Sequence, residues 1–261
     1  EVPSYFVIDR CYIHGHDGAR TRRGLNLSAR YVEILNSYFS KFHEPGADSQ
    51  AILGWNTPVD IVIANNYLEA ASENVMFGGV GIDIPDVVIT NILIERNFFF
   101  KPLSWRGQSP ALQIKNLLEF KNGANAVVRY NVFENSWAED QDGSAIVLTP
   151  RVDTVNSKIE NISFEYNLLR NVAGVFQMLS ENEYSDGTTQ PLKDINVENN
   201  LVISSGTSNG NQGRINMFSK GGTQIARNIV MTHNTSIMGG AGYRRYQVDG
   251  SNFISNLAFN S

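Results

Sequence analysis

The segment 115–123 carries charged residues that alternate with other side chains along an expected strand. Side chains two residues apart lie on the same face of a strand, so we expect Lys115, Glu119 and Lys121 to share one face. Amines and carboxylates held together can transfer protons and stabilise developing charge. The alternative is that they are solvated charges at a strand edge, where charge discourages pairing with another chain.

The next strand signal, 145–149, brings further polar groups to the same region. Asp142 and Arg151 flank this strand, and Thr149 ends it. Arg129 lies in an earlier strand of the same part of the chain. Arg151 and Arg129 are therefore the two guanidinium groups expected to accompany the lysines.

Composition excludes several classes of protein. The 261 residues include 21 Lys and Arg against 26 Asp and Glu, a net charge of −5, so there is no basic excess for nucleic acid. With 42% hydrophobic and 18% charged residues, a packed globular protein is expected. No apolar run approaches the roughly 20 residues that a membrane span needs. Cys11 is the single cysteine, which excludes an intrachain disulfide and a Cys-rich metal site.

The elements that position these residues belong to a repeat. Its pattern is apolar, any, apolar, two further residues, Asn, any, apolar, as in 61–68, and the apolar alternation is that of a strand. The Asn position recurs at steps of 22 to 36 residues. It is occupied by Cys11, Ser37, Asn66, Asn97, Asn131, Asn167, Asn200, Asn234 and Asn256. A second strand signal precedes most copies, at Leu25/Leu27, Ile52/Leu53, Val75/Phe77, Leu118/Phe120, Ile146/Leu148, Phe176/Met178 and Ile215/Met217.

This repeat predicts an all-β chain that forms one parallel β-helix of about nine coils over residues 1–261. Equivalent strands about 4.8 Å apart would make a rod roughly 40 Å long. The recurring Asn side chains are expected to hydrogen-bond to one another and to the turn backbone, as an internal ladder. Leucine-rich repeats need a tighter period, and propeller blades need four strands per repeat.

The terminal coils of a solenoid expose unpaired backbone groups unless something covers them. No amphipathic capping helix is evident at either end of the sequence. We therefore expect that the chain is a piece of a longer one, or that flanking domains or another chain cover its ends. The alternative is that the irregular residues 1–5 and 259–261 suffice.

The repeat and its Asn positions resemble the pectate-lyase-like superfamily of right-handed parallel β-helix proteins over essentially the whole chain. The segments 48–52, 65–69, 73–79 and 133–137 resemble bacterial proteins described only as right-handed parallel β-helix repeat proteins. The superfamily implies polysaccharide lyases, pectin hydrolases, uronate epimerases and phage tailspikes. These act on or bind acidic glycans, usually outside the cytoplasm, so a secreted or periplasmic protein is expected.

The resemblance also implies which chemistry to look for. The Asn-Thr-Asp and Gly-His-Gly signatures of pectin hydrolases and the Arg-x-Pro-x-x-Arg run of calcium-dependent pectate lyases are absent. The chain is more similar to lyases in which a lysine takes the C5 proton of a uronate and an arginine assists. That similarity implies Lys121 as the base, with Arg151 or Arg129 as the cation that offsets the uronate carboxylate.

Aromatic residues suggest a second route to a glycan. Trp55, Trp105 and Trp137 fall in loops just past strands, and exposed rings can stack on sugar C–H faces. The polar side chains near Trp55 and on the following coil that could hydrogen-bond a sugar are Asp48, Gln50, Glu69 and Glu73. The alternative is that the tryptophans lock long loops onto the rod.

No cofactor is predicted, although Ca²⁺ stays open. The run 139–143 alternates carboxylates before a Gly, which suits a Ca²⁺ loop, but the rest of a twelve-residue loop is missing. An acidic surface turn is the alternative. The four histidines are not spaced as a zinc set: His14, His16, His43 and His233.

Three functions remain open from the sequence. The first is a lyase that acts on acidic polysaccharide by β-elimination at a uronic acid. The second is a non-catalytic glycan-binding module of a larger secreted protein, and the third is a structural or adhesive rod.

Overall fold

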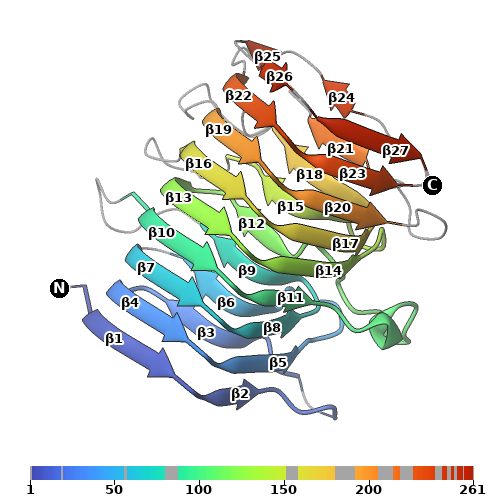
Figure 1. Cartoon of the computed structure of the whole chain (residues 1–261). Helices are drawn as coiled ribbons and strands as arrows, with labels where there is room; N and C mark the ends of the chain where they lie inside the picture. Colours follow the sequence, from blue (N-terminus) through green and yellow to red (C-terminus); the bar gives the residue numbers. More distant parts are fainter. Residues whose placement is uncertain are drawn as a thin grey trace, which may run out of the picture.

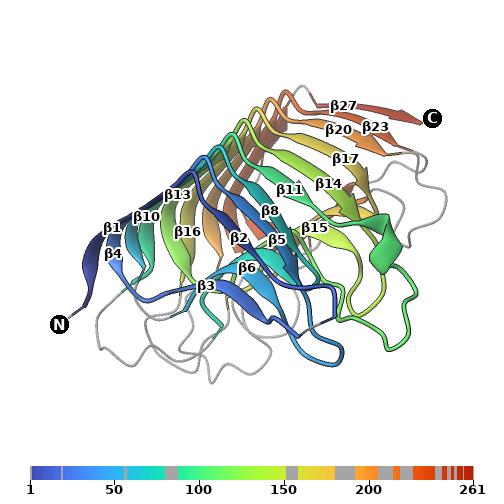
Figure 2. The ribbon, with the colours of Figure 1, turned by 90° about the horizontal axis from the view of Figure 1, so that it is seen from below.

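The computed structural model shows three parallel sheets wound about one axis (Figure 1), which confirms the predicted right-handed parallel β-helix. Figure 2 shows the three sheets enclosing the interior of the coil. Parallel strands joined by crossovers follow a right-handed path in nearly all proteins. The structure describes residues 2–18, 20–55, 58–79, 88–150, 158–179, 192–204, 214–217, 226–238, 243–245, 248–249, 252–254 and 256–260.

Sheet 1 precedes the Asn position in each coil. It contains β1 (Ser4–Asp9), β4 (Arg30–Leu35), β7 (Val59–Ala64), β10 (Thr90–Glu95), β13 (Gly123–Arg129), β16 (Ile159–Glu165), β19 (Lys193–Glu198), β22 (Ala226–Thr232), β25 (Val248–Asp249) and β26 (Asn252–Ile254). Sheet 2 follows the Asn position. It contains β2 (Tyr12–His14), β5 (Tyr38–Phe42), β8 (Tyr67–Ala70), β11 (Phe98–Phe100), β14 (Val132–Ser136), β17 (Leu168–Val172), β20 (Leu201–Ser204), β23 (Thr235–Met238) and β27 (Leu257–Asn260).

Sheet 3 closes each coil and contains the strands that the upstream signals predict and one more, the last of the series, which they do not predict. They are β3 (Arg23–Leu27), β6 (Gln50–Gly54), β9 (Glu73–Phe77), β12 (Leu118–Phe120), β15 (Ser144–Leu148), β18 (Gly174–Met178), β21 (Arg214–Met217) and β24 (Tyr243–Arg245). A short 3-10 helix, Leu103–Trp105, lies in the long connection between β11 and β12. Loop length varies in such connections, and this explains the uneven spacing of the repeat.

The core consists of apolar side chains stacked coil upon coil. In sheet 3 one inward column runs through Ile52, Val75, Leu118, Ile146 and Phe176, all of them buried. Burying a side chain of this size contributes about 1.5–3 kcal/mol. Because these positions alternate with outward ones, the outer face of sheet 3 is free to carry polar residues.

The predicted Asn ladder is present inside the turn between sheets 1 and 2. The backbone N–H of Asn66 donates to Asn97 Oδ1 at 2.9 Å, and Asn66 Nδ2 donates to the carbonyl oxygen of Ile34 in the preceding coil at 2.8 Å. The same N–H to Oδ1 contact continues at 2.9–3.1 Å through Asn97, Asn131, Asn167, Asn200, Asn234 and Asn256. Ser37 and Cys11 continue the series through the serine hydroxyl. These bonds fix the turn of each coil at one position.

A second, solvent-facing series of Asn and Asp side chains lies on sheet 1. Its members have positive φ values of 51–59°, a left-handed conformation that Asn and Asp tolerate better than other non-glycine residues. They are Asp60, Asn91, Asn125, Asn161, Asp194 and Asn228. Side-chain hydrogen bonds join three pairs of neighbours, Asp60–Asn91, Asn125–Asn161 and Asp194–Asn228, at 2.7–2.8 Å. Two Asn series, one buried and one exposed, therefore account for much of the 29 Asn in the sequence.

The N-terminal end of the solenoid is open in the described part of the chain. There β1 pairs with β4 alone, and Phe6 is 48% exposed. A cavity of about 300 Å³ at this end is lined by apolar side chains that include Phe6, Ile8, Leu25 and Leu27. Among the described residues, no helix has the length and apolar character required to cross a membrane.

Candidate active site

The outer face of sheet 3 carries Glu119 at the centre of a row of outward side chains. Strand register places Glu119 on β12 between Met76 on β9 and Val147 on β15. Its Oε1 lies 3.4 Å from Lys121 Nζ, and its Oε2 accepts a hydrogen bond from Asn116 Nδ2 at 3.0 Å. Lys121 directly follows β12, two residues after Glu119, and the two side chains that the sequence places on one face form an ion pair of ammonium and carboxylate.

Lys115 joins this pair to a second group of charged residues. Its Nζ lies 2.7 Å from Asp48 Oδ1 and 3.8 Å from Glu73 Oε1. Glu73 Oε2 accepts a hydrogen bond from Gln50 Nε2 at 2.5 Å, because β6 and β9 pair at these two residues. Three of the residues that the sequence assigns to sugar contact, Asp48, Gln50 and Glu73, thus lie beside one of the lysines that it assigns to catalysis.

Burial controls the electrostatics of this cluster. Glu73 is completely buried, and its burial, followed by the nearby Glu119 carboxylate, raises its pKa to about 7. Burial by itself would lower the pKa of Lys115, but the Glu73 and Asp48 carboxylates outweigh it and raise that pKa above its ordinary value. The cluster therefore holds Lys115 as a cation and allows Glu73 to carry a proton near neutral pH.

Several buried oxygens of the cluster have no hydrogen-bond donor among the described residues. They come from strands of sheet 3 and from the connection before β12, and are Gln50 Oε1, Glu73 Oε1, Asn116 Oδ1 and Ser144 Oγ. The side-chain amide of Gln50 donates an N–H to Glu73, and that of Asn116 donates an N–H to Glu119. The oxygen of each amide therefore points away from the carboxylate. Buried acceptors normally have donors. A proton on Glu73 would supply one such donor.

A polar cavity of about 280 Å³ opens beside the ion pair. Its lining consists of Glu119, Lys121, Gln141, Asp142, Val147, Thr149, Gln177 and Leu179. Carboxylate, ammonium, amide and hydroxyl groups together suit a ligand rich in hydroxyls and carboxylates. Met76 and the glycines after β9 shape the adjoining wall, since a Cβ at Gly79 would lie 2.4 Å from Met76 Cε and 3.2 Å from Lys121 Cδ.

Of the two arginines that the sequence assigns to the site, one lies on a different sheet and the other lies outside the described residues. Arg129 lies on β13 in sheet 1, where its Nε donates to Glu95 Oε2 at 2.9 Å. It is therefore held by a carboxylate on a different sheet from Lys121. Arg151 lies outside the described residues, so its role stays a prediction.

Two of the three tryptophans pack into the molecule. Trp137 is 1% exposed and Trp105 is 8% exposed, and both belong to a small apolar cluster with Ile114. Trp137 Nε1 also donates to Glu139 Oε2 at 2.6 Å. Neither ring presents an open face to a sugar, so the structure supports the alternative that these rings hold the long loops. Trp55 is half-buried directly after β6, and its part in sugar binding stays a prediction.

Asn116, Gln141 and Gln177 belong to the site but were missed by sequence reasoning. Asn116 Nδ2 joins Glu119 Oε2 to Gln141 Oε1, each at 3.0 Å, and Gln177 lines the cavity from β18. Neutral amides give no distinctive signal in an Asn-rich sequence. The strand register that aligns Gln177 with Val147 was the signal able to find that residue.

Within the described ranges, no three His, Cys, Asp or Glu side chains form a group suited to a metal ion. The run 139–143 contributes a hydrogen bond from Trp137 to Glu139 and the cavity residues Gln141 and Asp142. The structure does not test the prediction that no cofactor is required, nor the alternative that the run 139–143 binds Ca²⁺.

Comparisons with known proteins give limited information. No protein-family model and no curated protein matches the chain. Among solved structures, a polygalacturonase from Erwinia carotovora ssp. carotovora is similar over 99% of this chain and 82% of its own, with 7% identity and a TM-score of 0.46. The tailspike protein gp49 from Pseudomonas phage LKA1 is similar over 98% of this chain and 51% of its own, with 10% identity and a TM-score of 0.32. Neither likeness is close enough to support an argument about activity.

Proposed function

We propose that this protein acts on acidic polysaccharide by β-elimination at a uronic acid, in the polar cavity beside Glu119 and Lys121. The observation that carries the proposal is the Lys121–Glu119 ion pair, 3.4 Å long, at the edge of that cavity. A second amine, Lys115, lies within the same charged cluster. A secreted or periplasmic protein fits such a substrate.

The reaction requires three changes at the sugar. The C5–H bond breaks, a C4–C5 double bond forms, and the bond from C4 to the glycosidic oxygen breaks with protonation of the leaving oxygen. In our proposal Lys121 first loses a proton to solvent, and its free amine then takes the C5 proton. The ammonium formed in this way protonates the leaving oxygen, and Glu119 orients the Lys121 side chain. Gln141, Thr149 and Gln177 bind sugar hydroxyls from the cavity wall.

The uronate carboxylate needs a compensating cation, because negative charge grows on it as the proton leaves. Arg129 is unsuited to this role, since it lies on sheet 1 against Glu95. Arg151 follows the cavity residue Thr149 closely in sequence and is the cation that we propose.

The test is an ultraviolet assay for the unsaturated uronate product on polygalacturonate, alginate, chondroitin and hyaluronan, with Ca²⁺ and with a chelator. For Lys121→Ala we expect a loss of at least about 100-fold, which is the usual contribution of a general base. Arg151→Ala should also lose activity. Lys158→Ala is the matched control, because Lys158 pairs with Glu160 on sheet 1.

Absence of product from the unmodified protein on every substrate would contradict the proposed elimination activity. Equal rates for the unmodified protein and Lys121→Ala would place the reaction elsewhere. Binding of an acidic glycan without product favours the alternative function, a glycan-binding module. The cavity-lining groups Gln141, Thr149 and Gln177 favour this alternative, because amides and hydroxyls bind sugar hydroxyls without any proton transfer.

A further inference from the structure

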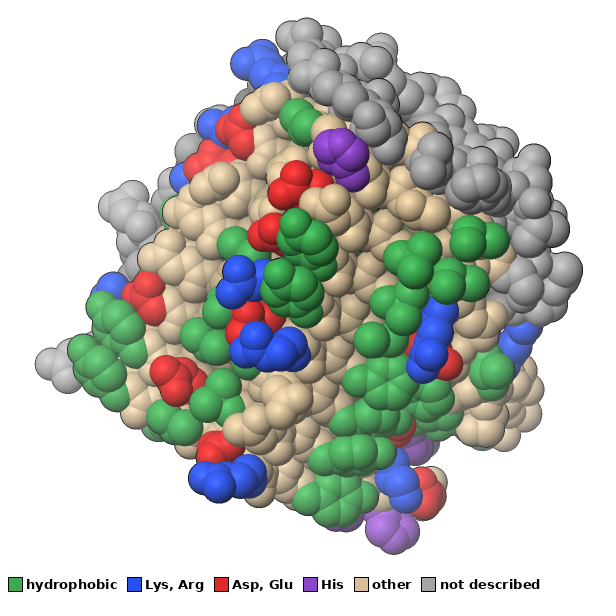
Figure 3. Space-filling model, in the orientation of Figure 1, with side chains coloured by type: hydrophobic (Ala, Val, Ile, Leu, Met, Phe, Trp, Pro, Cys, Tyr) green, Lys and Arg blue, Asp and Glu red, His purple; other side chains and the backbone are tan. Residues whose placement is uncertain are grey.

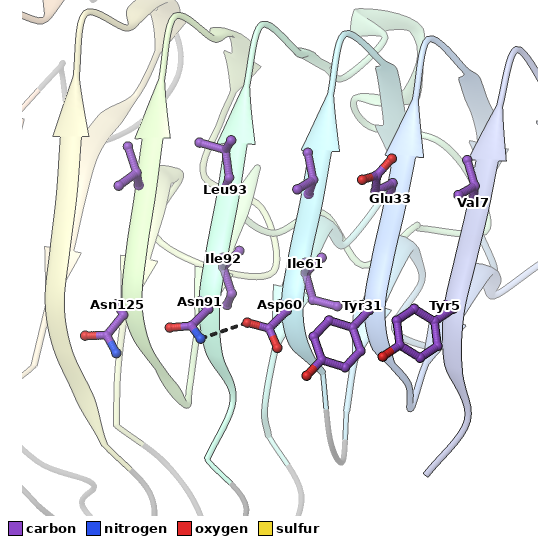
Figure 4. Close-up of a pocket in the computed structure, with 12 residues that line it drawn as sticks. Tyr5, Val7, Tyr31, Glu33, Asp60, Ile61, Asn91, Ile92, Leu93 and Asn125 are labelled. Carbon is purple, nitrogen blue, oxygen red and sulfur yellow. Dashed lines mark hydrogen bonds between the residues drawn. The ribbon is translucent and has the colours of Figure 1, made fainter.

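A second recess lies on sheet 1, away from the cavity on sheet 3. It is a groove of about 560 Å³ that crosses β1, β4, β7, β10 and β13. Figure 4 shows its lining as two rows that run across the strands, parallel to the solenoid axis. Five strands about 4.8 Å apart span about 19 Å, which gives room for a short linear ligand.

The two rows differ in chemistry. The first contains the aromatic and polar side chains Tyr5, Tyr31, Asp60, Asn91 and Asn125. The second is mainly apolar, and strand register aligns its members Val7, Glu33, Val62, Leu93 and Val127. The groove therefore combines an apolar floor, two aromatic rings and a line of hydrogen-bonding groups. Figure 3 shows hydrophobic and acidic side chains gathered over this end of sheet 1.

Tyr5 and Tyr31 occupy a backbone position that folding alone does not favour for tyrosine. Their φ values are +65° and +54°, and the equivalent residues of the next coils are Asp60, Asn91 and Asn125. A left-handed conformation is energetically unfavourable for a residue with a bulky side chain. The tyrosines recover little of this cost by burial, because they are 76% and 42% exposed.

Mutual stacking offsets part of the cost. The two ring centres are 4.8 Å apart and the ring planes differ by 10°, which is a favourable stacked arrangement. Tyr130 and Tyr166 form a similar exposed pair at φ values of +56° and +55°, but neither lines this groove. The aromatic pair alone is thus no evidence of a site. The combination with the polar row and the groove is what distinguishes Tyr5 and Tyr31.

We infer that this groove binds a neutral oligosaccharide, laid across the strands along the solenoid axis. Sugar C–H faces pack on the tyrosine rings and the apolar floor. The hydrogen-bonded pair Asp60–Asn91 presents an acceptor and a donor side by side to sugar hydroxyls. The carboxylates of Glu33 and Asp60 would repel a uronate, so the sugar is neutral.

Tyr5 is the main platform in this arrangement. The guanidinium carbon of Arg30 lies 5.6 Å from the Tyr31 ring centre, so Tyr31 already has a neighbour besides Tyr5. Tyr31 supports the Tyr5 ring and extends it toward Asp60 (Figure 4). The inference is independent of the elimination chemistry, because the groove and the cavity share no residue.

Isothermal titration calorimetry with cellohexaose, xylohexaose, mannohexaose and a galacturonate hexamer tests the inference. We expect at least one neutral hexamer to bind, and Tyr5→Ala and Tyr31→Asn to weaken that binding at least tenfold. Tyr31→Asn restores the residue type found in the next coils, so it should not lower the melting temperature. Tyr166→Asn is the matched control: it changes an equally strained tyrosine outside the groove and should keep full affinity.

No binding of any neutral hexamer to the unmodified protein would overturn the inference. So would equal affinity in Tyr5→Ala, or binding restricted to the galacturonate hexamer. Lys121→Ala, tested in parallel, should bind the neutral hexamer normally. If Lys121→Ala loses elimination activity but still binds the neutral hexamer, the cavity and the groove act independently. Failure of the elimination proposal can then be told apart from failure of the groove proposal.

Discussion

At Glu73, burial directly changes the pKa of a side chain in the candidate site. Its folded pKa of about 7 lies above the ordinary value of 4.5, because the carboxylate is buried and Glu119 is near. The folded protein therefore binds more protons than the unfolded chain between pH 4.5 and pH 7. The stability that this proton provides is complete below pH 4.5 and is lost as the pH rises through 7. A shift of this size corresponds to about 3 kcal/mol.

We therefore predict that Glu73→Gln gains stability relative to the unmodified protein as the pH rises. The melting-temperature difference, variant minus unmodified, should increase between pH 5 and pH 8, because glutamine carries no ionisable proton. Thermal denaturation followed by circular dichroism measures this. Glu134→Gln, at a half-buried residue paired with Arg170, reports the general effect of removing one negative charge. A difference for Glu73→Gln that does not vary with pH would show that Glu73 does not titrate in this range.

The charged residues of the site could be predicted only in part from the sequence. Alternation along β12 was enough to place Glu119 and Lys121 together, because period two is a local property. It did not predict that Asp48, Gln50 and Glu73 would meet Lys115, since that depends on the path of the long loop before β12. Lys101 gave no signal at all. It is completely buried, and its Nζ donates to three carbonyl oxygens of residues 70–72 and to Asn74 Oδ1.

Among the elements, the turn between sheets 1 and 2 was the most predictable. Its buried Asn recurs with apolar residues at fixed offsets, so the repeat identified both the turn and the strand before it. Sheet 2 was not predicted as a separate sheet, because its strands follow the turn without a break in the apolar pattern. The exposed Asn series on sheet 1 was also missed. It depends on a left-handed residue inside each strand, which composition does not locate.

The internal ladder gives a prediction at this scale. Asn131→Ala removes the Oδ1 that accepts from the Asn97 backbone and the Nδ2 that donates to the Ile94 carbonyl oxygen. Leaving such buried groups without partners should cost about 3 kcal/mol of unfolding free energy, measured by urea denaturation. Asn161→Gly is the matched control, since glycine keeps the positive φ and the exposed bond from Asn161 to Asn125 contributes little. Equal losses in the two variants would contradict a special role for the buried series.

At the scale of the whole molecule, the three sheets of the solenoid present three chemically different surfaces. Sheet 3 carries the charged cluster and the polar cavity, and sheet 1 carries the groove with the tyrosines. Sheet 2 carries a band of hydrophobic side chains (Figure 3), with Tyr12, Tyr38 and Tyr67 in register. Because each coil contributes one strand to every sheet, a change in one outward column leaves the other columns in place. A neutral glycan in the groove and an acidic glycan in the cavity would therefore not compete with each other.

The open N-terminal end leads to the last prediction. In the described residues β1 pairs on one side alone, and the apolar cavity beside Phe6 exposes the interior of the first coil. An edge strand with apolar residues and unpaired backbone groups is a template for another chain. We predict that the 261-residue chain associates with itself through this end as its concentration rises. Phe6→Lys should weaken that association, because a charge at the edge opposes pairing.

Sedimentation velocity over a hundredfold range of concentration measures the effect, and Tyr166→Lys places the same charge on an exposed turn away from the edge. Concentration-independent sedimentation of the unmodified chain would show that its first coil is protected without a partner, whereas equal effects of the two lysines would attribute the change to net charge rather than to the edge.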